Sequence, residues 1–327
     1  MSQHLSARWK ALWNHDMYHG WNKHKNYFEG WYVKIVSADQ GHAYAFIPGI
    51  SKETETNGHA FIQVMEGVKA QSQYIRFETD QFKPSQDRFD TQLGANRFHK
   101  NGLSLDLDGI KGELVFKNTH PWPTRMMAPG IMGWYSFVPF MQCYHGVVSL
   151  HHELEGSLNI NGEVVDFTGG IGYIEKDWGT SFPKTWIWTQ TNHLSNSTGA
   201  NCLMASVAHI PWLGQHFIGF LCGLMLDGEL HVFTTYNGSK YTALIEGEEI
   251  FLMFKHKSKV LEITAHKKAG AELISPMKGS MQGKLEESLQ SELDIRLSID
   301  GTVVYEGLGT SAGLEIAGPL ELITESK

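Results

Sequence analysis

The densest cluster of chemically active side chains lies between residues 173 and 188. This stretch holds two carboxyl groups, two lysines, a tyrosine and three tryptophans. Alternate side chains of an extended strand point to the same face, so Tyr173, Glu175 and Asp177 should share one face. Neighbouring carboxyl groups in an apolar setting raise each other's pKa, and an adjacent lysine can hold one of them ionised. The spacing therefore predicts one protonated acid and one carboxylate beside aromatic faces that can stabilise a cation.

The same residues also admit a structural interpretation. Lys176 could form a salt bridge with Glu175 or Asp177 beneath an aromatic core. A second set of alternate residues should share a face farther along the chain: Trp186, Trp188, Gln190 and Asn192. Spacing alone leaves the catalytic and the structural interpretation open.

Seventeen histidines invite a search for a metal site. His15 and His19 are four residues apart, a spacing at which two imidazoles of a helix can bind one ion, but no Glu or Cys completes that set. His151 and His152 would point to opposite faces of a strand and cannot share an ion. The Gly-x-Ser-x-Gly match at 309–313 has no His or Asp after it, as a hydrolase would need. The sequence therefore predicts neither a metal nor a cofactor.

The elements that must position these residues are strands joined by tight turns. Asn-Gly and Asp-Gly pairs tolerate the positive φ angles of the type I′ turn, and they occur at 108–109, 161–162, 227–228, 237–238 and 300–301. Three hairpins are expected: 157–160 with 163–168, 217–226 with 229–236, and 293–299 with 302–305. Apolar residues alternate strictly over 293–299, which is typical of a half-buried strand. Hairpins across most of the chain favour an all-β fold of antiparallel barrels or sandwiches.

Helix is expected mainly at the N-terminus. There Leu5, Trp9, Leu12 and Trp13 form an amphipathic stripe, Gly20 follows as a stop, and the Trp9–Trp13 pair should pack in the core.

A turn or two of helix is also expected over 284–289, and four prolines between 118 and 139 predict a long irregular connection. We place a domain boundary near residue 155. The expected organisation is an N-terminal amphipathic helix over 1–25, a first β domain over 26–155 and a second over 156–327.

Composition excludes several classes of protein. The chain has 327 residues, 12% of them aromatic and 19% charged, which argues against disorder and against a coiled coil. The net charge is −8 and no basic run exceeds Lys267-Lys268, so nucleic acid is not an expected partner. The longest apolar run, 217–226, is too short to span a bilayer. Three unpaired cysteines and the lack of an apolar signal region predict a reduced, cytoplasmic protein.

Several motifs resemble those of the tocopherol cyclase family. They are Phe28-Glu29-Gly30-Trp31-Tyr32-Val33-Lys34, Gly133-Trp134-Tyr135, Cys143-Tyr144-His145-Gly146-Val147-Val148-Ser149, Glu175-Lys176-Asp177-Trp178-Gly179 with Ser181-Phe182-Pro183 and Trp186-Ile187-Trp188, and Ala312-Gly313-Leu314-Glu315-Ile316 with Gly318-Pro319. They follow one another in order from about residue 25 to 320. The family is distantly similar to lipocalin-like carotenoid hydratases. The resemblance implies two lipocalin-like antiparallel β-barrel or sandwich domains with a short N-terminal helix.

The resemblance also implies a reaction. A tocopherol cyclase adds the phenol hydroxyl of a prenylated hydroquinone across the nearest double bond of the side chain, which gives a chromanol. Glu175 would be the general acid, at the place of the Asp in the Tyr-x-Asp pattern of the hydratases, with Tyr173 and His145 orienting it. Asp177 would deprotonate the phenol or hold Lys176. The substrate-binding residues implied by the same comparison are Trp178, Trp186, Trp188, Gln190, Asn192, Glu29 and Trp31.

A different class of function fits the same features. A non-catalytic lipocalin-like carrier of an apolar isoprenoid or lipid would need the aromatic lining but not the paired carboxyl groups. The expected partner in either case is a small apolar isoprenoid-type molecule, collected through transient contact with a membrane surface. The substrate itself could be another isoprenoid quinol or a terpenoid.

Overall fold

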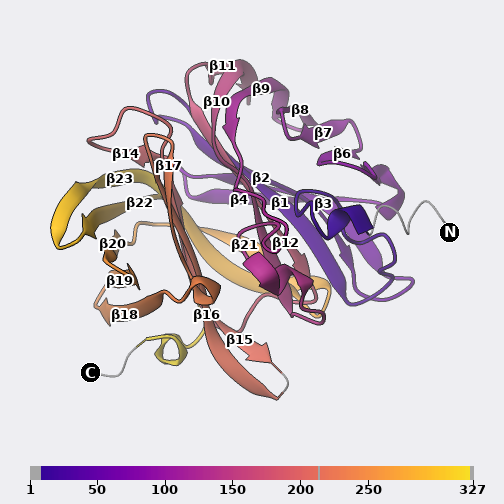
Figure 1. Cartoon of the computed structure of the whole chain (residues 1–327). Helices are drawn as coiled ribbons and strands as arrows, with labels where there is room; N and C mark the ends of the chain where they lie inside the picture. The colour runs from indigo at the N-terminus through magenta and orange to yellow at the C-terminus, as the bar shows by residue number, and fades with distance from the viewer. Residues whose placement is uncertain (1–8, 213, 325–327) are drawn as a thin grey trace. The chain divides into compact units, whose positions relative to one another are not determined.

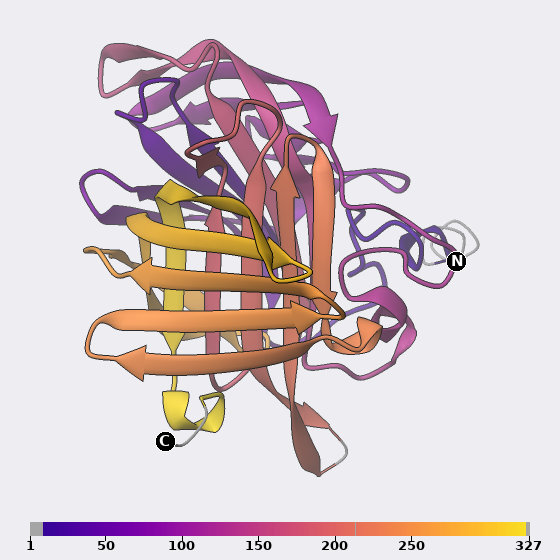
Figure 2. The same ribbon diagram turned by 60° about the vertical axis from the view of Figure 1, so that its left-hand side comes forward.

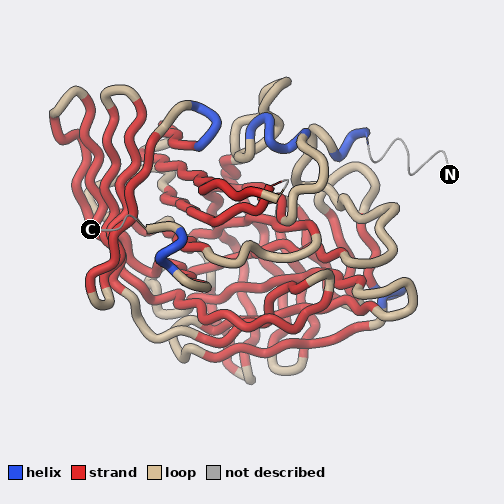
Figure 3. Tube along the Cα trace, turned by 90° about the horizontal axis from the view of Figure 1, so that it is seen from below, coloured by secondary structure: helices blue, strands red, loops and turns tan. Residues whose placement is uncertain are grey.

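The chain folds into antiparallel β-sheet, as its turn pairs predict (Figure 1). The computed structural model describes residues 9–212 and 214–324. Within these residues the helical segments are short, and strands predominate (Figure 3). Two compact units are present. Unit 1 comprises Met1–Glu66, Ser72–Phe182 and Ile274–Lys284, and unit 2 comprises Gly67–Gln71, Pro183–Leu273 and Leu285–Lys327.

Unit 1 is built on a sheet in the order β4-β3-β2-β1-β12-β10-β9-β8-β7-β6-β5, with β11 paired to β10. The elements are β1 Tyr27–Val36, β2 Ala43–Lys52, β3 Gly58–Glu66, β4 Gln71–Phe77, η1 Thr79–Gln81, β5 Phe82–Pro84, β6 Asp90–Leu93, β7 Asn96–His99, β8 Gly102–Leu107, β9 Ile110–His120, η2 Gly133–Phe137, β10 Cys143–Ile160, β11 Glu163–Asp166 and β12 Ile171–Gly179. The late strand β12 inserts between the early strand β1 and β10, which places it in the interior of the sheet.

Unit 2 is built on a sheet in the order β17-β16-β15-β13-β23-β22-β20-β19-β18 (Figure 2, orange to yellow strands). The elements are β13 Trp186–Thr191, β14 His193–Leu194, β15 Cys202–Trp212, β16 Gln215–Leu226, β17 Glu229–Thr234, η3 Thr235–Asn237, β18 Lys240–Glu246, β19 Glu249–His256, β20 Lys259–His266, β21 Ala271–Met277, β22 Ser280–Ile299, β23 Thr302–Ala317 and η4 Leu320–Leu322. β14 pairs with β23 and β21 with β22. Residues 274–284, which hold most of β21 and the start of β22, belong to unit 1.

The three predicted hairpins are confirmed. Their closing pairs are Ile160↔Glu163, Leu226↔Glu229 and Ile299↔Thr302. Both residues of each turn have positive φ, as a type I′ turn requires. Two other turn pairs differ: only Gly109 has positive φ in the β8–β9 turn, and Gly238 ends the short helix η3.

The helix predictions need correction. Leu5 lies outside the described residues, and between residue 9 and the start of β1 helix covers only residues 9–11. Trp9 is 64% exposed and Trp13 is 37% exposed, so the expected core packing of this pair is wrong. The two rings instead stack on each other at the surface, with centroids 6.2 Å apart. Residues 284–289 lie inside strand β22, because pairing with β23 overrides their weak helical preference.

The structure also divides the chain differently from the expected boundary near residue 155. Strand β10 runs unbroken from Cys143 to Ile160; it pairs with β12 from Cys143 to Glu153 and with β9 from His151 to Ile160. A boundary inside this strand would separate hydrogen-bonded partners, and the chain passes from unit 1 to unit 2 between Phe182 and Pro183 instead. The irregular connection predicted from its prolines is confirmed: it separates β9 from β10.

Each unit has its own apolar cluster. In unit 1 it includes Trp31, Phe46 and Phe98, and in unit 2 it includes Phe233 and Phe254. Among the described residues, no helix has the length and the hydropathy that a membrane span needs.

Candidate functional site

Strand β12 carries the cluster predicted from the sequence, and it has strands paired on both sides. Glu175 lies opposite Tyr32 of β1 and Val147 of β10, and Asp177 lies opposite His145 of β10. Because side chains alternate along a strand, Tyr173, Glu175 and Asp177 share one face, and Lys176 lies on the other. We call these the acid face and the lysine face of β12.

Four predicted residues meet on the acid face. The Tyr173 hydroxyl donates a hydrogen bond to Glu175 Oε2 over 2.6 Å. The same Oε2 lies 3.5 Å from His145 Nε2. His145 Nδ1, on the other side of the ring, lies 2.9 Å from Asp177 Oδ1. One imidazole therefore bridges the two carboxyl groups, and a tyrosine completes the chain at its buried end.

Solvent exposure of the side chains rises along this series from Tyr173 to Asp177. Tyr173 is fully buried, the Glu175 side chain is 7% exposed, His145 14% and Asp177 24%. The Asp177 end thus has the greater access to solvent, and Glu175 is the more buried of the two carboxyl groups. A gradient of this kind lets one end of the chain exchange protons with its surroundings while the other end stays dry.

The imidazole can connect the two carboxyl groups in more than one protonation state. With its proton on Nδ1, His145 donates to Asp177 and turns the lone pair of Nε2 toward Glu175. With both nitrogens protonated, it presents an N–H to each carboxyl group. A proton can therefore pass between Glu175 and Asp177 through one side chain.

Cys143 is a neighbour of this site that the sequence analysis did not assign to it. Its Sγ lies 3.7 Å from Asp177 Oδ1. Burial raises the pKa of the Cys143 thiol well above its usual range, and the charges of Asp177 and Glu175 raise it further. The group therefore remains a neutral thiol at neutral pH. No pattern in the sequence indicates this contact, since it depends on the register between β10 and β12.

The acid face also offers a set of possible metal ligands. Ligand atoms of His145, Glu175 and Asp177 all lie within 4.8 Å of one another. One imidazole and two carboxylates suit a transition-metal ion such as Zn²⁺. In the structure Asp177 Oδ1 lies within hydrogen-bonding distance of His145 Nδ1, and Glu175 Oε2 accepts a hydrogen bond from Tyr173, so two of these ligand atoms already have polar partners.

The histidines considered for metal binding in the sequence have other contacts. Both ring nitrogens of His15 lie within hydrogen-bonding distance of backbone carbonyl oxygens, those of Pro129 and Val147. His152 is fully buried against Ser149, and burial lowers its pKa to about 3. Neither residue belongs to the acid face.

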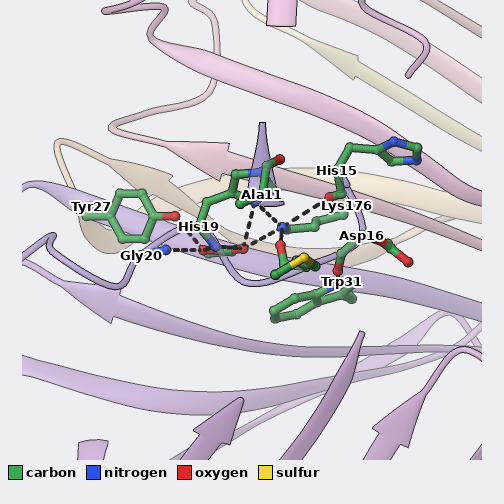
Figure 4. A network of polar contacts seen from close by, with 10 residues as sticks. Ala11, His15, Asp16, His19, Gly20, Tyr27, Trp31 and Lys176 are labelled. Carbon is green, nitrogen blue, oxygen red and sulfur yellow. Dashed lines mark hydrogen bonds and ion pairs between the residues drawn. The ribbon is translucent and has the colours of Figure 1, made fainter. Parts of the chain in front are cut away.

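Lys176 shows which salt bridge the structure contains. Its Nζ lies 2.5 Å from Glu29 Oε1, and both side chains are fully buried (Figure 4). The predicted salt bridge with Glu175 or Asp177 is therefore wrong, and so is the idea that Asp177 holds Lys176. The physical reason is the alternation of the strand, which turns Lys176 away from both neighbouring carboxyl groups.

The lysine face is a saturated polar network (Figure 4). Lys176 Nζ donates to the backbone carbonyl oxygens of His15, over 3.2 Å, and Met17, and lies 2.7 Å from His19 Nδ1. It also lies over the rings of Trp31 and Trp178, 4.9 and 4.5 Å from their centroids. The lysine thus fastens the segment before β1 to the sheet.

Glu29 completes the network from the opposite side. Its carboxylate accepts hydrogen bonds from the backbone N–H groups of His19 and Gly20 over 2.9 to 3.1 Å, and from the Tyr27 hydroxyl. Burial alone would raise the pKa of Glu29, but the Lys176 ammonium and His19 lower it to about 2. Burial lowers the pKa of Lys176, and the adjacent Glu29 carboxylate opposes that shift, so each charge stabilises the other and the pair is ionised at neutral pH. Burial and the Lys176 charge lower the pKa of His19, which keeps its ring neutral.

Three predicted substrate-binding residues belong to this lysine face. Glu29, Trp31 and Trp178 lie opposite or beside Lys176 in the register of β1 and β12. Trp178 stacks on His19, with centroids 4.2 Å apart. These residues therefore contact the network around Lys176 and not the acid face.

The remaining predicted residues lie in unit 2. Trp186, Trp188 and Gln190 alternate along β13, on the face turned away from the apolar cluster that holds Ile187. Trp186 Nε1 donates to Glu315 Oε2 over 2.8 Å. The amides of Gln190 and Asn192 hydrogen-bond to each other over 2.7 Å. The expected shared face is present: Trp188, Gln190 and Asn192 are buried within unit 2, and Trp186 at the start of β13 is half-buried.

Comparisons with known proteins agree with the motifs. The chain matches the tocopherol cyclase-like family over residues 112–318. A protein of Oryza sativa subsp. japonica named "Probable tocopherol cyclase, chloroplastic" is 24% identical over 196 residues, which make up 57% of this chain and 42% of that relative. The chain thus spans less than half the length of this relative.

Solved structures share the fold. CghA in complex with Sch210972 has a TM-score of 0.56 and 10% identity, over 89% of both chains. An AttH protein of Nitrosomonas europaea has a TM-score of 0.53 and 14% identity, over 89% of this chain and 92% of its own. At these identities the likeness concerns the arrangement of strands.

Proposed function

This chain belongs to the tocopherol cyclase-like family, and from that premise we propose that it is a proton-initiated cyclase acting on a prenylated hydroquinone or a related isoprenoid. Glu175 protonates an alkene of the isoprenoid side chain, and the phenol oxygen closes the ring to a chromanol. The observation that carries the proposal is the single imidazole between two carboxyl groups on the acid face of β12. The reaction is an isomerisation and needs no cofactor.

Each proton has a place in this scheme. Protonated Glu175 gives its proton to the less substituted carbon of the alkene and leaves a tertiary cation. The phenol oxygen attacks that cation and forms the new C–O bond. The phenol proton passes to Asp177, and His145 returns it to Glu175. One C–H and one C–O bond form, one O–H bond and one π bond break, and the enzyme regains its starting state.

The neighbouring groups support the two ends of the relay differently. Tyr173 donates to Glu175 Oε2 and fixes the direction in which the carboxyl group points. Asp177, with its greater exposure, is the end that can receive a proton from the hydroxyl group of an entering ligand. We assign Glu29, Trp31 and Trp178 to positioning β12, because their contacts lie around Lys176.

Deuterium incorporation tests the proposed proton transfer. The protein is incubated with a short-chain prenyl hydroquinone in D₂O, and products are analysed by mass spectrometry. We expect a chromanol carrying one deuterium on the carbon next to the new quaternary centre. Glu175→Gln should lower turnover by about a hundredfold or more, the usual contribution of a general acid. The control is Glu153→Gln, an exposed glutamate on the paired strand β10, which should keep full turnover.

Four results would contradict the proposal in whole or in part. Unchanged turnover of Glu175→Gln would remove Glu175 as the acid. Tight binding of prenyl quinols without turnover would favour the non-catalytic carrier. Loss of turnover in EDTA, restored by an added divalent cation, would assign the His145–Glu175–Asp177 set to a metal. Formation of a tertiary alcohol in place of the chromanol would keep Glu175 as the acid but make water the nucleophile.

A further inference from the structure

One surface of unit 1 exposes an unusual number of large apolar side chains. They lie on two segments, 9–14 and 121–142, and their exposed fractions range from 37% for Trp13 to 96% for Phe140. We call this surface the apolar patch; its members are Trp9, Leu12, Trp13, Met126, Met127, Trp134 and Phe140. Scattered single apolar residues are ordinary on protein surfaces, but a concentration of seven on two segments marks an interaction site.

Trp13 joins the two segments into one surface. Its ring packs 6.2 Å from that of Trp9 and 5.7 Å from that of Phe137 in η2. Its indole N–H donates to the backbone oxygen of Met126 over 3.2 Å. Trp134 belongs to the same short helix as Phe137 and stacks on Tyr135. These contacts join segment 9–14 to the turn at Met126 and to η2, from which Trp134 projects.

The most exposed members are presented by tight backbone structures. Arg125 and Ala128 exchange both backbone hydrogen bonds, which places Met126 and Met127 at the tip of a two-residue turn. Phe140 has a φ of +67°, a conformation that a bulky residue rarely adopts. Because the Phe140 side chain is almost fully exposed, it gains no burial energy that would offset this backbone strain. The backbone therefore holds Phe140 outward at a cost to stability.

The Tyr144 side chain holds the loop that carries Phe140. Its hydroxyl donates to the backbone oxygen of Val138 over 2.8 Å and lies 3.4 Å from the backbone N–H of Met141, an acceptor–donor pair that brackets Phe140. Tyr144 in turn packs against Trp178, with ring centroids 5.5 Å apart. The loop that presents Phe140 is therefore anchored directly on β12.

The charge of the patch differs from that of the whole chain. The protein carries a net charge of −8, yet segments 9–14 and 121–142 contain two cations, Lys10 and Arg125, and no acidic residue. Both cations are exposed among the apolar side chains. Anionic lipid head groups attract such cations, while tryptophan and tyrosine rings favour the boundary between head groups and acyl chains.

From these observations we propose that the apolar patch docks the protein on the surface of a membrane that contains anionic lipid. Met126, Met127 and Phe140 enter the boundary of the acyl chains, and Lys10 and Arg125 contact the head groups. Projecting turn and loop tips suit a fluid lipid surface, whereas a folded protein partner would need a matching concave surface. The proposal does not rest on the cyclase reaction, and binding to lipid can be measured without any substrate.

Vesicle flotation tests this proposal. The full chain is mixed with vesicles of phosphatidylcholine, or of phosphatidylcholine with phosphatidylglycerol, at low and at high ionic strength. We expect binding to the anionic vesicles, weakened by salt, and quenching of tryptophan fluorescence by brominated lipid. The variant Met126→Ser/Met127→Ser/Phe140→Ser should lower the partition coefficient about tenfold or more. The control is Val164→Ser, which removes an equally exposed apolar residue from the distant β10–β11 hairpin.

A parallel variant, Lys10→Gln/Arg125→Gln, should lose the preference for anionic vesicles but keep the tryptophan quenching at high lipid concentration. Absence of the wild-type protein from floated vesicles of both compositions would overturn the proposal. Equal binding by the patch variant and the Val164→Ser control would do the same. Self-association that the patch variant abolishes, without vesicle binding, would reassign the surface to contact between copies of the chain.

Discussion

The two faces of strand β12 use similar side chains for different purposes. The lysine face joins a lysine, a glutamate, a tyrosine and a histidine in a network at whose centre Lys176 and Glu29 are fully buried and ionised, each with several polar partners. The acid face joins two carboxyl groups, a histidine and a tyrosine along a gradient of exposure that ends at Asp177. What separates them is the charge balance: the lysine face pairs opposite charges, whereas the acid face brings two carboxyl groups to one imidazole, the arrangement from which we propose proton transfer.

This difference predicts which face contributes to stability and which to turnover. A paired buried charge is costly to disturb, because removing one partner leaves the other ion desolvated. A carboxyl group that exchanges protons must be able to change its protonation state. Its neighbours therefore cannot all be ions that stabilise only one of its two states. The Lys176–Glu29 ion pair and the acid face thus lie on opposite faces of the same nine-residue strand.

The largest expected effect comes from breaking the buried ion pair. Lys176→Met leaves the Glu29 carboxylate buried without its cation, and we expect the free energy of unfolding to fall by about 3–5 kcal/mol. The segment from His15 to Gly20 should also lose protection against hydrogen exchange, since it donates to Glu29 or accepts from Lys176. Urea unfolding and hydrogen exchange measure both effects.

Two variants sharpen this prediction. Glu175→Gln, one residue away on the acid face, should change the unfolding free energy by less than about 1 kcal/mol, because an amide can still accept from Tyr173. Glu29→Gln combined with Lys176→Met should be less destabilised than Lys176→Met alone, since no unpaired charge remains. Equal losses for Lys176→Met and Glu175→Gln would abolish the distinction between the two faces.

The ionised state of Glu29 also predicts how acid acts on the fold. The pKa of Glu29 is about 2 in the folded protein, against a usual value of 4.5. Below pH 4.5 the unfolded chain binds a proton that the folded chain does not, so the contribution of Glu29 to stability is complete above pH 4.5 and lost as the pH falls toward 2. The full loss corresponds to about 3 kcal/mol.

Glu29→Gln should remove that part of the acid dependence. Urea unfolding at a series of pH values between 5 and 3 should give a flatter profile for this variant than for the wild type. Glu153→Gln, which replaces an exposed carboxyl group, should keep the wild-type slope. A profile of Glu29→Gln as steep as that of the wild type would show that the pair is not ionised in the fold.

The sequence predicts the residues of the acid face but not the buried ion pair on the opposite face of β12. Tyr173, Glu175 and Asp177 follow from strand periodicity alone, and His145 follows from the family resemblance, so the four residues that meet were all predictable. The partner of Lys176 was not predictable, because Glu29 lies on a strand nearly 150 residues earlier and becomes its neighbour only through the pairing of β1 with β12. Local spacing pointed instead to the adjacent carboxyl groups, which the alternation of the strand turns away.

The hairpins were predictable because a tight turn depends only on its own residues. Asn161-Gly162 and the two Asp-Gly pairs of the other hairpins adopt the positive φ angles that the turn needs. The Trp9–Trp13 stripe shows the converse. An amphipathic pattern indicates that one face is apolar, but it does not say whether that face meets a protein core or a surface outside the protein. The exposure of both rings decides this, and it depends on contacts with residues more than a hundred positions away.

The smallest expected effect concerns Cys143, which reports the charge at the exposed end of the acid face. Burial and the Asp177 carboxylate hold its pKa well above the usual range, so native protein should react slowly with iodoacetamide at pH 8. Asp177→Asn removes the neighbouring charge, and alkylation of Cys143, followed by peptide mass spectrometry, should become several-fold faster. Cys202 and Cys222 are buried in unit 2 and provide internal controls whose rates should not change. An unchanged rate at Cys143 would mean that Asp177 carries no charge in the resting protein; the carboxylate that we propose as the acceptor of the phenol proton would then already be occupied.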